Sequence, residues 1–211
     1  MKKIAMKTLA LVLLLLCTAA TPLGAAELKL DSSLNETVLM IPKKGLFTIN
    51  LETTLYKPEG AGPFPVVIIN HGKAYGNPRF QDRYRPVSGV RYFLQRGYAV
   101  VVPMRQGFAK SEGSYIGGGC NIESNGAVQA SDVKAVLDYV TAQPWADREQ
   151  MLMVGQSHGG WTTLAFGRST STRWPDCTYA GQAETRGCGR CRWGRSALAA
   201  LAVVPAGSTD L

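Results

Sequence analysis

A Gly-x-Ser-x-Gly turn between a predicted strand and a predicted helix constrains the fold of this chain most. The apolar run Met151–Val154 predicts a buried strand, and Ser157–Phe166 predicts the start of a helix. Gly155 and Gly159 flank the serine, and glycine lets the backbone bend sharply because it has no Cβ atom. A strand that passes into a helix over so short a turn belongs to a sheet in which strands and helices alternate.

The chain before this turn follows the same alternation. Two extended segments around a Lys-Lys-Gly turn come first, and the second alternates polar and apolar residues as a half-buried antiparallel strand does. Short β-branched runs predict buried parallel strands, and apolar residues at helical spacing predict helices. The predicted elements before the turn are strands Thr37–Ile41, Leu46–Tyr56, Val66–Ile69 and Ala99–Val102, and helices Ser88–Gln95 and Ser124–Val140. The predicted fold class is α/β, a mostly parallel sheet with an antiparallel N-terminal hairpin and helices on both faces.

Polar segments follow the predicted parallel strands. Ligands of sheets of this kind bind at the carboxyl ends of the strands. Three segments fall at those ends: residues 70–73 (Asn-His-Gly-Lys), 105–107 (Arg-Gln-Gly) and 155–160 (Gly-Gln-Ser-His-Gly-Gly). We therefore expect the functional site at this edge of the sheet.

The N-terminus has the pattern of a secretory signal peptide. Three lysines precede the apolar run Leu9–Leu16, and small residues continue to Ala26. We predict a signal peptide over residues 1–26, cleavage near Ala26, and export to the periplasm or the medium, where disulfides persist. A membrane anchor is one alternative, but the apolar run is too short to span a bilayer. A lipoprotein anchored through Cys17 is another.

The composition changes after Phe166. Residues 167–211 hold six arginines, three acidic residues and three of the five cysteines, but no Lys, Ile, Phe, Asn or His. This tail and the N-terminal lysines supply most of the net charge of +8, and residues 27–166 are nearly neutral. The charge is therefore weak evidence for a nucleic-acid partner. Leu198–Val204 is Ala-rich and apolar and is predicted as a short helix.

The turn at Ser157 has the context of a nucleophile elbow, in which a serine hydroxyl is presented between a strand and a helix. The backbone N–H of His158 is then one expected donor to an oxyanion. The loop after Val66–Ile69 is expected to supply a second donor at Lys73, and Gly72 permits close approach of the backbone. The alternatives are a glycine-rich turn that only packs, or a phosphate-binding loop. No lysine follows the glycines, as a P-loop requires.

The chain has two histidines, and neither is predicted to be the base that activates the serine. The His158 side chain is expected to project away from the hydroxyl, because the two residues are adjacent. His71 is expected to organise the oxyanion loop through hydrogen bonds. Asp82 and Asp132 are predicted as surface or capping residues, and Asp147 as part of the loop before the third parallel strand.

Four segments resemble α/β-hydrolases, in particular the secreted bacterial branch of dienelactone hydrolases and prolyl-oligopeptidase-like enzymes. They are PFPVVIINHG, VVVPMRQGFAKSEGSY, SDVKAVLDYVTAQPWAD and VGQSHGGWTTLA, and the resemblance spans residues 28–166. It implies Ser157 as the nucleophile, the amides near Lys73 and His158 as oxyanion donors, and ester, thioester, amide or peptide substrates. In this family the triad acid and histidine follow the serine, but the only histidine among the 54 residues after Ser157 is His158.

We therefore interpret the chain as an incomplete α/β-hydrolase fold. Residues 27–166 form a partial hydrolase domain, and residues 167–211 are an out-of-frame translation or a disordered tail. Under this hypothesis Cys188 and Cys191, in CGRC, have no function. The alternatives are a redox pair or half of a zinc site, which needs about four ligands. We predict no metal and no cofactor.

The predicted function is a serine hydrolase that forms an acyl-enzyme at Ser157 and is inactive as written, because the triad acid and base are absent. The alternatives are a non-catalytic binding protein with a hydrolase-like pocket, and a non-functional fragment that does not fold stably. The expected partner is a small-molecule or peptide substrate. Neither nucleic acid nor, after signal cleavage, a membrane is expected as a partner, and the sequence indicates no oligomeric state.

Overall fold

The computed structural model describes residues 29–117, 121–169 and 199–204. The chain divides into two units, Met1–Leu30 and Asp31–Leu211, and every element named below lies in the second. The predicted signal peptide, residues 170–198 of the tail and all five cysteines lie outside the described residues. Within the described ranges, no helix combines the length and the hydropathy that crossing a membrane requires.

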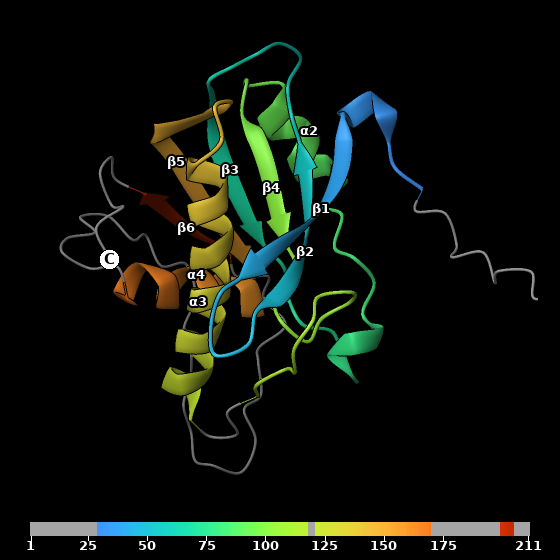
Figure 1. The fold of residues 1–211 in the computed structure, drawn as a ribbon. Helices are drawn as coiled ribbons and strands as arrows, with labels where there is room; N and C mark the ends of the chain where they lie inside the picture. Colours follow the sequence, from blue (N-terminus) through green and yellow to red (C-terminus); the bar gives the residue numbers. More distant parts are fainter. Residues whose placement is uncertain (1–28, 118–120, 170–198, 205–211) are drawn as a thin grey trace, which may run out of the picture. The chain divides into compact units, whose positions relative to one another are not determined.

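Six strands form one mixed sheet in the order β1-β2-β4-β3-β5-β6 (Figure 1). The strands are β1 (Glu36–Lys43), β2 (Ile49–Tyr56), β3 (Phe64–Asn70), β4 (Ala99–Pro103), β5 (Ala146–Gln156) and β6 (Ala199–Val204). The hairpin of β1 and β2 is antiparallel, and β3 pairs in parallel with β4 and with β5. The predicted α/β class with an antiparallel start is confirmed. Parallel pairing is confined to β4, β3 and β5, because β2–β4 and β5–β6 are antiparallel.

Helices cover both faces of the sheet, as predicted (Figure 1). The helices are α2 (Val87–Leu94), α3 (Ile122–Thr141) and α4 (His158–Ser169), and short 3-10 turns lie at Ser32–Leu34 and Pro78–Phe80. The Asn121 side chain caps α3 by accepting a hydrogen bond from the Ser124 N–H at 2.9 Å. The apolar stripe predicted for this helix is buried against the sheet at Val133, Val136, Leu137 and Val140.

The central strands are buried on both sides, so their side chains alternate between two cores. Val66 and Ile68 of β3 belong to the core that also contains residues of α3 and α4. Val67 and Ile69 belong to the opposite core, which contains Val90 of α2. A strand with two apolar faces needs a continuous apolar run, which is why this segment could be predicted as a buried strand.

Two of the predictions about element positions are wrong. Leu198–Val204 was expected to be helical, but Ala199–Val204 is β6 and pairs antiparallel with β5. The free edge of β5 offers a row of unpaired backbone groups, and this pairing overrides the helix propensity of alanine. Asp147 was expected in the loop before β5, but it lies inside the strand, where the register with β3 shifts.

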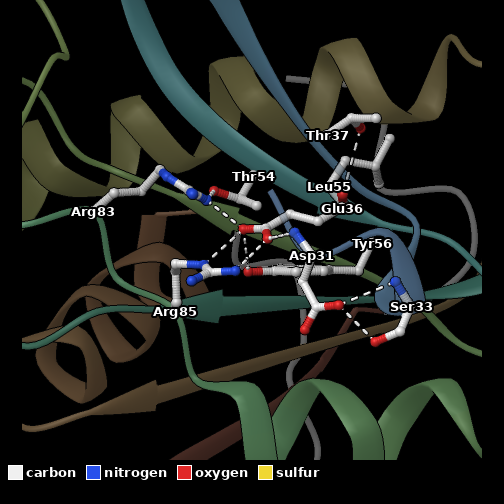
Figure 2. Close-up of polar contacts among 9 residues, drawn as sticks. All are labelled: Asp31, Ser33, Glu36, Thr37, Thr54, Leu55, Tyr56, Arg83 and Arg85. Carbon is white, nitrogen blue, oxygen red and sulfur yellow. Dashed lines mark hydrogen bonds and ion pairs between the residues drawn. The ribbon is translucent and has the colours of Figure 1, made fainter. Parts of the chain in front are cut away.

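A buried carboxylate joins the N-terminal hairpin to the segment between β3 and α2 (Figure 2). Glu36 of β1 accepts hydrogen bonds on Oε1 from Arg83 Nη1 at 2.7 Å and from Arg85 Nε at 2.8 Å. Tyr56 of β2 donates its hydroxyl to the same oxygen at 3.1 Å. On Oε2, Glu36 accepts from Arg85 Nη2 and, at 2.7 Å, from the Asp31 backbone N–H. One side chain thus ties together both strands of the hairpin, the turn before it and the segment before α2.

The two arginines keep Glu36 charged. Burial by itself raises the pKa of this carboxyl, but hydrogen bonds from Arg85 and Arg83 outweigh burial and lower the pKa from 4.5 to about 2. Because the pKa is lower in the folded state than in the unfolded chain, the cluster contributes its full stability above about pH 4.5. That contribution is lost as the pH falls toward about 2.

Replacing Glu36 is expected to destabilise the fold in a pH-dependent way. At neutral pH, Glu36→Gln should lower the free energy of unfolding by about 3 kcal/mol, because it leaves Arg83 and Arg85 without their buried counter-charge. Urea unfolding followed by circular dichroism measures this loss. The difference from the wild type should shrink as the pH is lowered toward about 2, where the wild-type carboxylate also becomes neutral.

A matched control exists in the exposed pair of Lys134 and Asp138, whose Nζ and Oδ2 atoms are 2.9 Å apart on α3. Asp138→Asn should change the free energy of unfolding by less than about 0.5 kcal/mol. A Glu36→Gln penalty as small as that of the control, or one that stays constant down to about pH 2, would contradict the interpretation.

Candidate active site

Ser157 occupies a strained turn between β5 and α4. Its φ angle is +54°, in the left-handed region that residues with a Cβ atom rarely adopt. The two flanking glycines make this turn possible for different reasons. A Cβ atom on Gly155 would lie 2.1 Å from the carbonyl oxygen of Gly159, and one on Gly159 would lie 2.1 Å from the carbonyl oxygen of Asn70. The backbone of α4 is therefore pressed directly against the end of β3.

The loop after β3 lies against the serine. A Cβ atom built on Gly72 would be 3.5 Å from Ser157 Cβ and 3.4 Å from the carbonyl oxygen of Gln156. Asn70 Nδ2 also donates to Thr163 Oγ1 of α4 at 3.0 Å. The structure thus brings together the two segments that the sequence singled out, residues 70–73 and 155–160.

His71 is fully buried and holds this loop from inside. Its Nδ1 is 2.6 Å from the carbonyl oxygen of Gly72, and its Nε2 accepts the backbone N–H of Arg105 at 3.2 Å. These partners assign the proton to Nδ1, because a carbonyl accepts and a backbone N–H donates. Burial and the neighbouring Arg105 charge lower the pKa of His71 well below 6.5, so the ring is neutral.

His158 is the first residue of α4 and is half-buried. Burial lowers the pKa of its imidazole to about 4, and the charges of Arg105 and Lys73 act in the same direction. Lys73 Nζ donates to the carbonyl oxygens of Ala74 at 3.1 Å and of Gly76 at 3.3 Å. Both histidines are therefore uncharged at neutral pH in a positively charged environment.

Arg105 is a site residue whose importance the sequence did not reveal. It follows β4 and is 1% exposed, and its Nη2 lies 3.4 Å from the Nδ1 atoms of both His71 and His158. Burial lowers the pKa of the guanidinium to about 9, although Asp132 and Tyr115 oppose the shift. The signal available in the sequence was its place at the carboxyl end of a buried strand, the edge where the site was expected.

Asp132 is not the surface or capping residue that was predicted. It is 1% exposed, and its Oδ1 forms an ion pair with Lys43 Nζ of β1 at 2.6 Å. Its Oδ2 accepts the backbone N–H of Gln106 at 3.0 Å, so the carboxylate connects α3 and the hairpin to the loop that begins at Arg105. Asp132 precedes Val136 by four residues, a spacing that puts it beside the buried stripe of α3. Asp82, by contrast, is exposed, as predicted.

A model for the X-Pro dipeptidyl-peptidases of the S15 family matches residues 45–173, which is more than half of the chain. The chain belongs to the S15 family. This hydrolase family confirms that the four quoted segments were correctly interpreted as those of an α/β-hydrolase. The match includes β2 to β5, α2 to α4 and every residue that was singled out around Ser157. No curated protein sequence matches this S15 family member.

Solved structures of hydrolases resemble part of the chain. The Pyrococcus furiosus esterase Pf2001 is 18% identical with a TM-score of 0.48, covering 70% of this chain and 51% of its own. Est1E from Butyrivibrio proteoclasticus, solved with ferulic acid, is 21% identical with a TM-score of 0.47, covering 62% and 47%. Dipeptidyl peptidase 4 from Porphyromonas gingivalis is 23% identical with a TM-score of 0.46, covering 62% and 18%. The chain spans about half the length of the first solved structures it matches.

Among the described residues, no group of three or more His, Cys, Asp or Glu side chains is placed to hold a metal ion. The alternatives raised for Cys188 and Cys191, a redox pair or half of a zinc site, concern residues outside the described ranges.

Adding a methyl group to Gly159 is expected to disrupt the contact between α4 and β3. A Cβ atom there would meet the carbonyl oxygens of Asn70 at 2.1 Å and His71 at 2.7 Å, and backbone atoms cannot rotate away. Gly159→Ala should therefore lower the free energy of unfolding by about 3 kcal/mol or prevent folding. Chemical denaturation measures the change.

Gly89 of α2 provides the matched control. A Cβ atom there meets only Ile69 Cδ1 at 3.8 Å, which is ordinary contact. Gly89→Ala should leave stability unchanged or raise it by up to about 1 kcal/mol, because alanine favours a helix. If Gly159→Ala changes the free energy of unfolding no more than Gly89→Ala does, the backbones of α4 and β3 do not approach as closely as described.

Proposed function

We propose that this protein is a serine hydrolase that cleaves an ester, thioester, amide or peptide bond through an acyl-enzyme at Ser157. The observation that supports this best is the left-handed turn at Ser157, which places a serine between a strand and a helix as a nucleophile elbow does. Membership of a peptidase family is the second support. The family's description makes a peptide with proline in the second position the first peptide substrate to test.

In the proposed reaction, Ser157 Oγ attacks the carbonyl carbon of the substrate, and the carbonyl oxygen becomes an oxyanion. The backbone N–H groups of His158 and Lys73 are the proposed donors to that oxyanion. The His158 N–H follows the serine directly and lies at the start of α4, the place that a nucleophile elbow gives to an oxyanion donor. The proximity of Gly72 to Ser157 Cβ supports the role of the adjacent Lys73 N–H. Each such donor contributes about 3 kcal/mol to transition-state stabilisation.

We further propose that acylation is slow in this chain, because neither histidine suits the role of general base. Both ring nitrogens of His71 are engaged, by the Gly72 carbonyl and by the Arg105 N–H. His158 is a weak base, since its pKa is about 4. A serine without a base is a poor nucleophile at neutral pH. The same observation favours the second candidate function, a protein that binds an acyl compound or peptide without turning it over.

A fluorophosphonate probe tests the nucleophile directly. The probe bonds its phosphorus to the serine oxygen and releases fluoride, and the hydroxyl proton passes to solvent. We expect slow labelling of the full chain at the peptide that contains Ser157, detected by mass spectrometry, and no labelling of Ser157→Ala. Ser169→Ala is the control, because Ser169 Oγ lies at the other end of α4, where it donates to the Phe166 carbonyl at 2.9 Å.

Equal labelling of the wild type and Ser157→Ala would contradict the proposed nucleophile. If Ser157 is labelled, turnover of a p-nitrophenyl ester and of an X-Pro p-nitroanilide distinguishes the two substrate classes. Absence of labelling together with saturable binding of a peptide that carries proline in the second position would support the binding protein.

Export remains a proposal. We propose that residues 1–26 are removed as a signal peptide and that the mature protein lies in the periplasm or the medium. Its partner there is a small-molecule or peptide substrate. N-terminal sequencing of the protein recovered from an expressing bacterium tests this, and a first residue other than one close to Glu27 would contradict it.

A further inference from the structure

Arg105 is a buried cation whose charge is not neutralised by direct contact. Its side chain is 1% exposed, and no ion pair to it occurs among the described residues. Its Nε and Nη1 atoms are buried without a hydrogen-bond partner in that part of the chain. The neighbouring carboxylate, Asp132, is already bound by Lys43 and by the Gln106 N–H. Such burial is costly for the fold, so a role outside stability is to be sought for this residue.

Arg105 lies over the ring of Phe108, with Cζ 5.1 Å from the ring centre, and its polar contacts lead to both sides of Ser157. A guanidinium has only donors, so Nη2 donates toward His158 Nδ1 across 3.4 Å. The same Nη2 lies 3.4 Å from His71 Nδ1, where the ring proton is already directed to the Gly72 carbonyl. This second contact is electrostatic and disfavours a second proton on the ring. The Arg105 backbone N–H holds the other ring nitrogen at 3.2 Å.

The hydrogen bond from His71 to Gly72 determines how the following N–H points. The Gly72 carbonyl and the Lys73 N–H belong to one planar peptide unit and face opposite ways. His71 Nδ1 and Gln81 Nε2 donate to that carbonyl at 2.6 Å and 3.3 Å. Fixing the carbonyl therefore also fixes the direction of the Lys73 N–H. If His71 were doubly protonated, its Nε2–H would face the Arg105 N–H, and the hydrogen bond between Arg105 and His71 would be lost.

We propose that Arg105 is a positioning residue for the oxyanion side of the Ser157 site. It clamps the loop after β3, through His71, to the first residue of α4, through His158, and its positive charge favours an oxyanion between them. The inference rests on the proposed function, because it assigns Arg105 to the same reaction. It differs from a structural role in a measurable way, since a buried cation without a counter-charge does not stabilise the fold.

The test compares Arg105→Met with Arg105→Lys in the full chain. Methionine keeps an unbranched apolar stem at this position without the charge or the donors of the guanidinium. We expect Arg105→Met to slow fluorophosphonate labelling of Ser157 by about 10-fold to 100-fold, as for a displaced catalytic group. Its unfolding midpoint should be unchanged or raised. Arg105→Lys should recover part of the labelling rate, because lysine restores the charge but not the fork of donors.

Arg79→Met is the matched control. Arg79 also donates into the loop after β4, to the carbonyls of Ala109, Ser111 and Gly113, but it touches neither histidine. This control should lower the unfolding midpoint and leave the labelling rate of the folded protein near that of the wild type. Unchanged labelling of Arg105→Met would overturn the inference. The inference would also be overturned if Arg105→Met lost labelling and stability together and Arg105→Lys restored neither.

Nuclear magnetic resonance of the histidine rings separates a failure of this inference from a failure of the proposed function. In the wild type we expect His71 as the Nδ1–H tautomer, with slow exchange of that proton. In Arg105→Met the exchange should be faster and the pKa of His158 should rise from about 4. If the wild type is not labelled at all, the proposed hydrolase function fails, and the ring spectra alone test whether Arg105 positions the two histidines. Identical ring spectra of the wild type and Arg105→Met would then overturn the role of Arg105.

Discussion

The close approach of two backbones, at the start of α4 and the end of β3, is the constraint on which the site depends. It is possible only because residue 159 has no side chain, since a Cβ atom there would lie 2.1 Å from the Asn70 carbonyl oxygen. The approach brings the loop after β3 against Ser157 and forces the serine itself into the left-handed region at φ +54°. The packing of both elements maintains the strain of that turn.

Two buried carboxylates hold the loops around this contact. Glu36 anchors the segment between β3 and α2 through Arg83 and Arg85, and Asp132 anchors the loop after β4 through Lys43 and the Gln106 N–H. Both loops pass the site, and further hydrogen bonds, such as those from Arg79 to the carbonyls of Ala109 and Gly113, add to these anchors. Because both carboxylates contact residues of the β1–β2 hairpin, an element remote from Ser157 in sequence helps to hold the loops around it. Loops built this way can carry function while a rigid sheet carries the stability.

The elements that could be predicted from the sequence are those with a strong local pattern. The β-branched runs of β3 and β4 and the apolar stripe of α3 were located within a few residues, because burial on one or two faces leaves a direct trace in the spacing of apolar side chains. The turn at Ser157 was equally visible, because only glycine fits at positions 155 and 159. The Ala-rich segment of β6 carried no such trace, and the unpaired edge of β5 decided its conformation. Which charged residues form the buried ion pairs also could not be predicted from the sequence, because charged residues usually mark a solvent-exposed face.

The sequence by itself determined the α/β class, the place of the serine between a strand and a helix, and the membership of a hydrolase family. These features follow from the spacing of apolar residues and from the position of glycines. Both are properties of short segments of the chain. Only the tertiary structure decided which polar groups surround the serine. Arg105, His71 and His158 are far apart in the chain, and they come together because the carboxyl ends of parallel strands meet at one edge of the sheet. Their charge states follow from burial and mutual proximity, which no stretch of sequence specifies alone.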